Sequence, residues 1–135
     1  MAYYFKGYAM KRLELVQKIR ERKKQLGITV ENLAKLSGVG VRTVNRLLNN
    51  EDVKLSTVEA VTTLLGLDFA GNEVAPLQTL RKQRAHQKAL FLASIVQSTS
   101  SLEMQGLDTE HINKIIADYE EAFLNGSYQK SLWVA

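Results

Sequence analysis

Cysteine is absent from the 135-residue chain. Disulfides, thiolate metal sites and cysteine nucleophiles are therefore excluded together, and a reducing cytoplasm fits this composition. Long hydrophobic runs are missing as well, because the longest, residues 89–96, is far shorter than the ~20 residues of a membrane-spanning helix. The N-terminus also lacks the apolar region after a basic start that marks a targeting segment. We expect a soluble, cytoplasmic protein with no membrane partner.

The residues and motifs of catalytic sites are scarce. His86 and His111 are the only histidines, and neither has a metal-ligating partner three or four residues further on, so we expect both at the surface. No Gly-rich phosphate loop and no nucleophile elbow is present. The acidic residues of the last predicted helix are not set in surroundings suited to acid–base catalysis. The prediction is a protein that is not an enzyme and that binds neither a cofactor nor a metal.

Apolar residues recur at helical spacing along the chain, and no strand pattern is present. The predicted fold is therefore all-α. Its helices are expected over residues 10–27, 30–37, 41–49, 57–65, 77–98 and 108–125.

Local signals define the ends of these helices. Glycines end two of them, at Gly27 and Gly126, while Thr29 and Asp108 are expected as N-caps. The Ser56–Glu59 pair has the spacing of a capping box, which predicts a helix that begins at residue 57. In the first helix, the residues expected to face the core are Leu13, Val16, Ile19 and Leu26.

Residues 30–49 have the spacing of a helix-turn-helix, in which two helices joined by a short glycine-containing turn cross steeply. Gly38 can take the positive φ of the turn, and Val39 and Val44 are expected to fill the angle between the helices. The remaining residues of the second helix must then face outward. They are Val41, Arg42, Asn45, Arg46 and Asn49. Such a helix fits the DNA major groove, where Arg pairs with guanine and Asn with adenine.

The alternative is an ordinary helical hairpin with a solvated polar face. Charge favours DNA binding, because residues 1–75 hold 12 Lys and Arg against 8 Asp and Glu, whereas residues 76–135 hold six of each.

The segment ITVENLAKLSGVGVRTVNRLLNN, residues 28–50, resembles the helix-turn-helix of bacterial repressors. Its recognition part is close to lactose-repressor-type headpieces. The flanking IRERKKQLGIT and VKLSTVEAVTTLLGLD are similar to the Cro and phage-repressor (Xre) type, a five-helix DNA-binding domain. The resemblance covers about residues 10–70.

The resemblance implies roles for individual residues. It implies that four residues contact bases: Val41, Arg42, Asn45 and Arg46. It implies that three residues bind phosphate: Thr29, Gly40 and Thr43. Two positions depart from the usual pattern: Val30 replaces a Gln that follows the capping Thr, and Gly40 replaces a Ser or Thr at the cap of the recognition helix.

Residues 66–76, with two glycines and the only proline, mark a boundary. We predict an aromatic N-terminal arm over residues 1–9, a helix-turn-helix DNA-binding domain over residues 10–70, and a helical dimerisation or partner-binding region over residues 76–135. The aromatic residues of the arm are Tyr3, Tyr4, Phe5 and Tyr8. The arm is expected to dock on its own fold or on a neighbouring subunit, and the alternative is a partly disordered leader.

The predicted function is a sequence-specific transcriptional regulator, a repressor that binds double-stranded DNA as a homodimer. The alternative is an antitoxin that binds and neutralises a toxin protein and autoregulates its operon. The basic run at residues 81–88 is open to three interpretations: contact with phosphates, contact with the acidic last helix of its own or another chain, or a solvated face.

Overall fold

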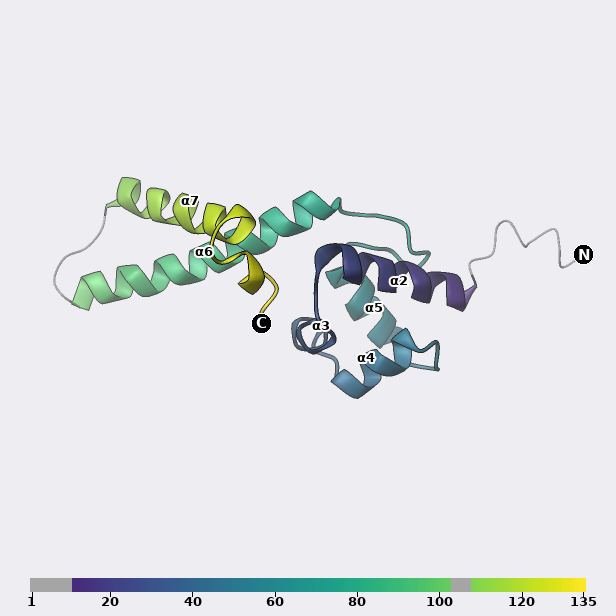
Figure 1. Ribbon diagram of the computed structural model, residues 1–135. Coiled ribbons are helices and arrows are strands. Elements are labelled where there is room, and N and C mark those ends of the chain that lie inside the picture. Colours follow the sequence, from purple (N-terminus) through teal and green to yellow (C-terminus); the bar gives the residue numbers. More distant parts are fainter. Residues whose placement is uncertain (1–10, 103–107) are drawn as a thin grey trace, which may run out of the picture. The chain divides into compact units, whose positions relative to one another are not determined.

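The computed structural model describes residues 11–102 and 108–135, so the aromatic arm predicted at residues 1–9 lies outside the described residues. The elements are α2 (Arg12–Leu26), α3 (Val30–Ser37), α4 (Val41–Leu48), α5 (Leu55–Leu64), α6 (Leu77–Leu102), α7 (Thr109–Asn125) and the 3-10 helix η1 (Gln129–Ser131) (Figure 1). The described residues form no strand, only an isolated bridge between Leu67 and Glu73. The all-α fold predicted from the sequence is confirmed. The chain separates into two compact units between Leu77 and Gln78.

The first unit is built from α2 to α5 around an aliphatic core. Its largest fully buried side chains are Ile19, Leu33, Leu65, Val16, Val44 and Val61. These residues come from all four helices or their ends, so each amphipathic stripe is buried against the others. In Figure 1, α3 is seen nearly end-on while α4 runs across the view, which is the steep crossing of a helix-turn-helix.

The turns of this unit follow local sequence. Gly27 and Gly38 end α2 and α3 with φ of 74° and 71°, a left-handed conformation that glycine adopts without steric cost. Thr29 is the N-cap of α3, and its hydroxyl accepts a hydrogen bond from the Asn32 amide at 3.1 Å. These predicted helix ends are confirmed.

Two predictions about this unit are wrong, one about the core and one about the start of a helix. Leu13 is 50% exposed, because it lies one turn before the buried stripe of α2 and the core does not extend that far. The capping box at Ser56 and Glu59 does not form. Instead α5 begins at Leu55 after Lys54, whose side chain makes no capping bond. The earlier start places Thr57 inside the first turn, where it is buried.

A buried arginine joins α2 to the segment that leaves the unit. Arg22 is 5% exposed, and its Nε donates to the Leu65 carbonyl at 2.8 Å. Its guanidinium also donates to the Ala75 carbonyl and lies 3.3 Å from a carboxylate oxygen of Glu73. The bonds from Arg22 therefore hold residues 66–75 against α2.

We expect Arg22→Met to lower the free energy of unfolding by about 3 kcal/mol, because two carbonyl groups lose their buried donor. Urea denaturation followed by circular dichroism measures this. The matched control is Lys24→Met, an exposed position on the same helix, for which a change within about 0.5 kcal/mol is expected. Equal effects of the two substitutions would contradict a structural role for Arg22.

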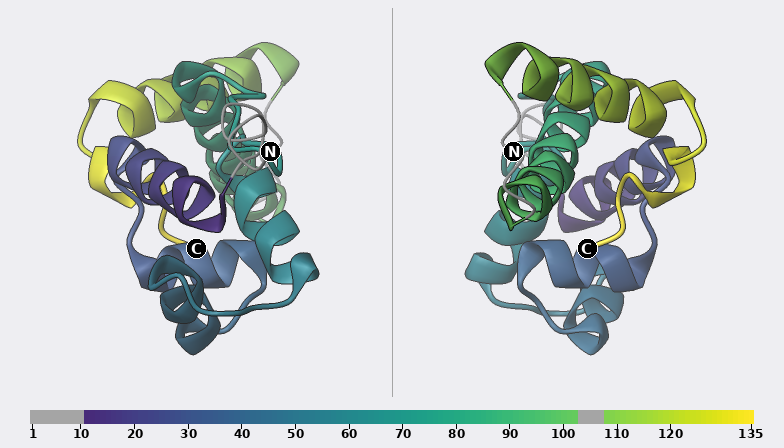
Figure 2. Two further views of the ribbon diagram at one scale, coloured as in Figure 1. Left: turned by 90° about the vertical axis from the view of Figure 1, so that its right-hand side faces the viewer. Right: turned by 90° about the vertical axis from the view of Figure 1, so that its left-hand side faces the viewer.

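The second unit consists of α6, α7 and the segment that follows. Asp108 caps α7 as predicted, accepting a hydrogen bond from the His111 amide at 2.8 Å, and this bond lowers the pKa of Asp108. Figures 1 and 2 show α7 crossing α6 rather than running beside it along its full length. The buried side chains of the unit are Ala85, Ala89, Ala93, Phe123, Leu132 and Trp133.

The basic run at residues 81–88 is engaged with its own chain. Arg84 donates to the carbonyls of Leu132 at 2.9 Å and Val134 at 2.7 Å, and Lys88 donates to the Ser131 carbonyl at 2.6 Å. Burial lowers the pKa of both cations. His86 lies 2.6 Å from a carboxylate oxygen of Glu120 on α7. Contact with the acidic last helix of the same chain is therefore one of the uses of this run.

Both histidines are exposed, as predicted. Among the described residues no three His, Asp or Glu side chains are grouped so that they could hold a metal ion. Within the same residues, no helix has the length and apolar character needed to cross a membrane.

Candidate nucleic-acid interface

The second helix of the helix-turn-helix, α4, carries its apolar and polar residues on separate sides. Val44, Leu47 and Leu48 are buried. The predicted base-reading residues all lie exposed on the same short helix: Val41, Arg42, Asn45 and Arg46. Since the buried residues fix the helix against the core, its outer side is a rigid, solvent-facing surface about two turns long.

The other predicted site residues lie at helix ends. Thr29 and Gly40 are the N-caps of α3 and α4, so the unbonded backbone amides of each first turn point outward near them. Gly40 contributes no capping side chain. Asn49 is the exposed C-cap of α4, and Thr43 is half-buried.

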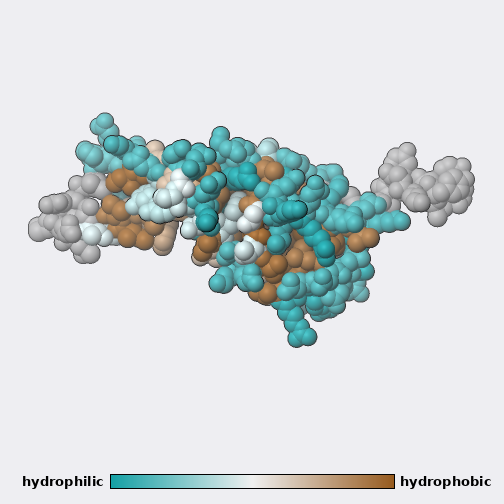
Figure 3. Space-filling view, viewed as in Figure 1, coloured by the Kyte–Doolittle hydropathy of each residue, from teal (hydrophilic) through white to brown (hydrophobic). Residues whose placement is uncertain are grey.

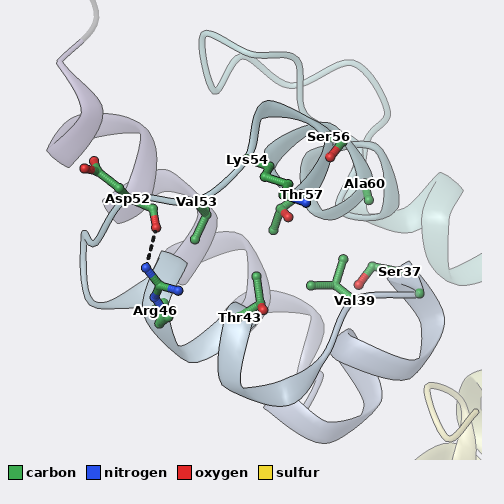
Figure 4. A pocket seen from close by; sticks show the side chains of 11 residues that line it. Ser37, Val39, Thr43, Arg46, Asp52, Val53, Lys54, Ser56, Thr57 and Ala60 are labelled. Atoms are coloured by element: carbon green, nitrogen blue, oxygen red, sulfur yellow. Dashed lines mark hydrogen bonds between the residues drawn. The ribbon is translucent and has the colours of Figure 1, made fainter.

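A pocket of about 720 Å³ lies between α4, the turn before it and the start of α5 (Figure 4). Its polar residues include Thr43 and Arg46 from α4 and Lys54, Ser56 and Thr57 from the start of α5. Two cations and an uncapped helix N-terminus thus border the same space, and this arrangement suits an anion.

Thr57 supports this reading of the pocket. Its residue is 8% exposed, and in Figure 4 its hydroxyl points into the pocket. The negative group at the rim, the Asp52 carboxylate, is already paired with Arg12.

Arginines of α2 hold the segment that follows α4. Arg20 donates to the Leu48 carbonyl in the last turn of α4. Arg12 donates from Nε to the Asn50 side chain at 3.0 Å and pairs with Asp52. From α4 itself, Arg46 donates to the Asp52 carbonyl at 3.1 Å (Figure 4).

Sequence reasoning missed Arg12, Arg20, Lys54 and Thr57. The arginines are indistinguishable in sequence from the other cations of α2, because their partners lie 28 to 40 residues away. For Lys54 and Thr57 a signal existed, since a cation and hydroxyls at a helix start are typical of phosphate sites, but the helix start was misplaced.

Comparison with known proteins finds one family. Residues 19–72 match the family model described as helix-turn-helix, and no curated protein or solved structure matches the chain. The match supports the Cro and phage-repressor resemblance; the likeness to lactose-repressor headpieces stays a prediction. Residues 19–72 are thus similar to the helix-turn-helix domains that DNA-binding transcription regulators use.

Proposed function

We propose that the protein is a cytoplasmic, sequence-specific transcriptional repressor that binds DNA as a dimer. DNA binding lies in residues 10–70 and dimerisation in residues 76–135. The observation that carries the proposal is the outer side of α4, where Arg42 and Asn45 are exposed beside a fully packed inner side. Side chains of this kind on a helix narrow enough for the major groove read bases directly.

The base-reading roles follow from side-chain chemistry. Arg42 forks to O6 and N7 of guanine, Asn45 pairs with N6 and N7 of adenine, and Val41 contacts a thymine methyl group. Arg46 lies at the edge of this surface, because its guanidinium reaches toward the segment after α4. Arg46 contacts either a base or the adjoining phosphate, depending on the DNA sequence that is bound.

Phosphate contacts position the domain on the duplex. The protein's backbone amides at Thr29 and Gly40 bind phosphates of one stretch of the DNA backbone. The Thr43 hydroxyl and the Asn49 side chain contact the same stretch beside α4. In the pocket, a phosphate oxygen accepts hydrogen bonds from the Thr57 hydroxyl and the start of α5, and the charge of Lys54 stabilises it.

Selection from a pool of random duplexes tests the function. We expect the full-length protein to enrich a site with two inverted half-sites whose centres lie about 34 Å, one helical turn, apart. The matched control is the same selection with Arg42→Ala, which should enrich less specific half-sites. Failure of the native protein to enrich any sequence would contradict sequence-specific regulation.

The antitoxin function is the second candidate. The exposed apolar side chains of α6, outside the DNA-binding domain, are the observation that favours it, because a toxin could cover them. Co-expression with the product of a neighbouring gene tests it: a stable complex that abolishes that product's toxicity supports an antitoxin.

A further inference from the structure

A second pocket adjoins the one between α4 and the start of α5. It lies between the end of α3 and the outer side of α5. Three residues line both pockets: Ser37, Ser56 and Ala60. We call the two pockets together the α3–α5 groove. Their volumes, about 720 and about 400 Å³, are in the range of small-molecule sites, which is about 300–1,000 Å³.

The α3–α5 groove is cationic at one end. Arg46 and Lys54 border that end, and the first amides of α5 are beside Lys54 with no capping side chain. The Asp52 carboxylate at the rim is paired with Arg12. Most of the remaining lining is apolar and half-buried: Leu36, Val39, Val53, Ala60 and Leu64. The groove therefore offers an anion site that continues into an apolar surface.

DNA accounts for only the cationic end of the groove. The DNA backbone is charged at every nucleotide and offers no long apolar chain. In Figure 4, Val39 on the turn and Ala60 on α5 lie on opposite sides of the space, so an apolar group between them would contact both. Figure 3 shows apolar surface on the first unit, over the part where α3 and α4 lie in Figure 1. The apolar part of the groove is thus open to a different ligand.

The far end of the groove carries a negative charge. Glu59 lines it and is exposed. Lys54 and Glu59 are five positions apart on α5, which separates them by about 7.5 Å along the helix axis. A second negative charge on a ligand would meet the Glu59 carboxylate and be repelled. The groove therefore selects a ligand with one anionic group and an uncharged chain.

We propose that the α3–α5 groove binds a small organic anion with an apolar chain, and that this ligand competes with DNA. Its anionic group lies at Lys54 and the first amides of α5, and its chain runs along Ala60 toward Leu64. The anionic group takes the position of the DNA phosphate, so the ligand releases the protein from DNA. This regulatory consequence rests on the function proposed above, whereas binding to the groove does not.

Titration of the ¹⁵N-labelled full-length protein with three carboxylates, followed by NMR, tests the groove. Acetate has only the anionic group, hexanoate adds an apolar chain, and adipate adds a second carboxylate at the end of that chain. We expect hexanoate to bind about tenfold more tightly than acetate, because its chain covers apolar surface. Adipate should bind no more tightly than acetate, because its second carboxylate loses water beside an apolar lining. The amides that shift should be those of Ser56, Ala60 and Leu64.

A variant that fills the apolar part tests the position of the chain. Ala60→Met keeps helix propensity and places a longer side chain in the groove, so it should abolish the tenfold difference between hexanoate and acetate. The matched control is Ala117→Met, the same substitution at an exposed position of α7, which should retain the difference. Circular dichroism verifies that both variants keep their helices.

Fluorescence anisotropy of a labelled duplex, at equal ionic strength, tests the competition. Hexanoate should weaken DNA binding by the native protein more than acetate does. Equal binding of hexanoate and acetate, shifts confined to amides outside the groove, an equal effect of Ala117→Met, or equal weakening of DNA binding by the two anions overturns the proposal. A native protein that binds DNA but not hexanoate refutes this inference alone. One that binds hexanoate in the groove but no DNA contradicts the proposed function and supports the groove as a ligand site.

Discussion

Raising the salt concentration from about 50 to about 200 mM is expected to weaken DNA binding by about a thousandfold. If each subunit neutralises about three phosphates, a dimer releases counterions from about six, and log K falls with log salt at a slope near −5. The candidate cationic and helix-end contacts at α3, α4 and the α5 pocket are sufficient for that number. Fluorescence anisotropy of a labelled duplex across a salt series measures the slope.

The proposed phosphate contact in the pocket contributes to that slope, and a substitution of Lys54 measures this contribution by itself. Lys54→Gln should reduce its magnitude by about 1 for each subunit that loses a phosphate contact. Lys130→Gln is the matched control, because Lys130 is exposed in the second unit and outside the proposed interface with DNA. A native slope near zero would contradict DNA binding as the function. An unchanged slope in Lys54→Gln would contradict the proposal that a DNA phosphate binds in the pocket.

Arg42→Ala is expected to weaken binding to the selected site by about 1–3 kcal/mol per half-site and to relax preference at one or two base pairs. For two half-sites the loss is about 30- to 20,000-fold. The reason is the loss of a bidentate pair with guanine. Because Arg42 is exposed and α4 is held by buried residues, the unfolding transition should not change. Competition binding against every single-base variant of the site measures both effects.

A second substitution at position 42 separates the contribution of the Arg42 charge from its contribution to base recognition. Arg42→Lys retains the charge but cannot form the planar fork, so it should lose preference while retaining affinity for random DNA. Equal losses on the selected site and on random duplexes in Arg42→Ala would show that this residue only touches phosphate. Recognition would then have to be sought elsewhere on α4.

Sequence predicted those parts of the fold that depend on neighbouring residues. Gly38 and Thr29 act within one turn of the helices they border, so their residue types are sufficient evidence. The inward position of Val44 is predicted by helical spacing alone. The first unit was therefore predictable almost helix by helix, including the side of α4 that faces solvent.

The remaining features depend on partners that are distant in sequence. Nothing local distinguishes Arg22, which is buried against two carbonyls, from Lys24, which is exposed two residues later. The start of α5 was misplaced because Ser56 and Glu59 satisfy a local rule, whereas the helix begins two residues earlier, after Lys54. In the extension, the apolar residues of α6 were recognisable, but their division between covered and exposed sides depends on where α7 crosses.

Arg20 donates a hydrogen bond to the last residue of α4 and Arg12 donates one to Asn50 just after it, and these bonds affect the conformational entropy that DNA binding costs. A recognition helix whose end was loose would have to be ordered when it entered the groove, and that ordering would subtract from affinity. Here the end of α4 and the segment that leads to α5 are already held by α2 in the free protein. The reading surface is therefore preorganised, and its association with DNA needs no conformational step that would slow the encounter.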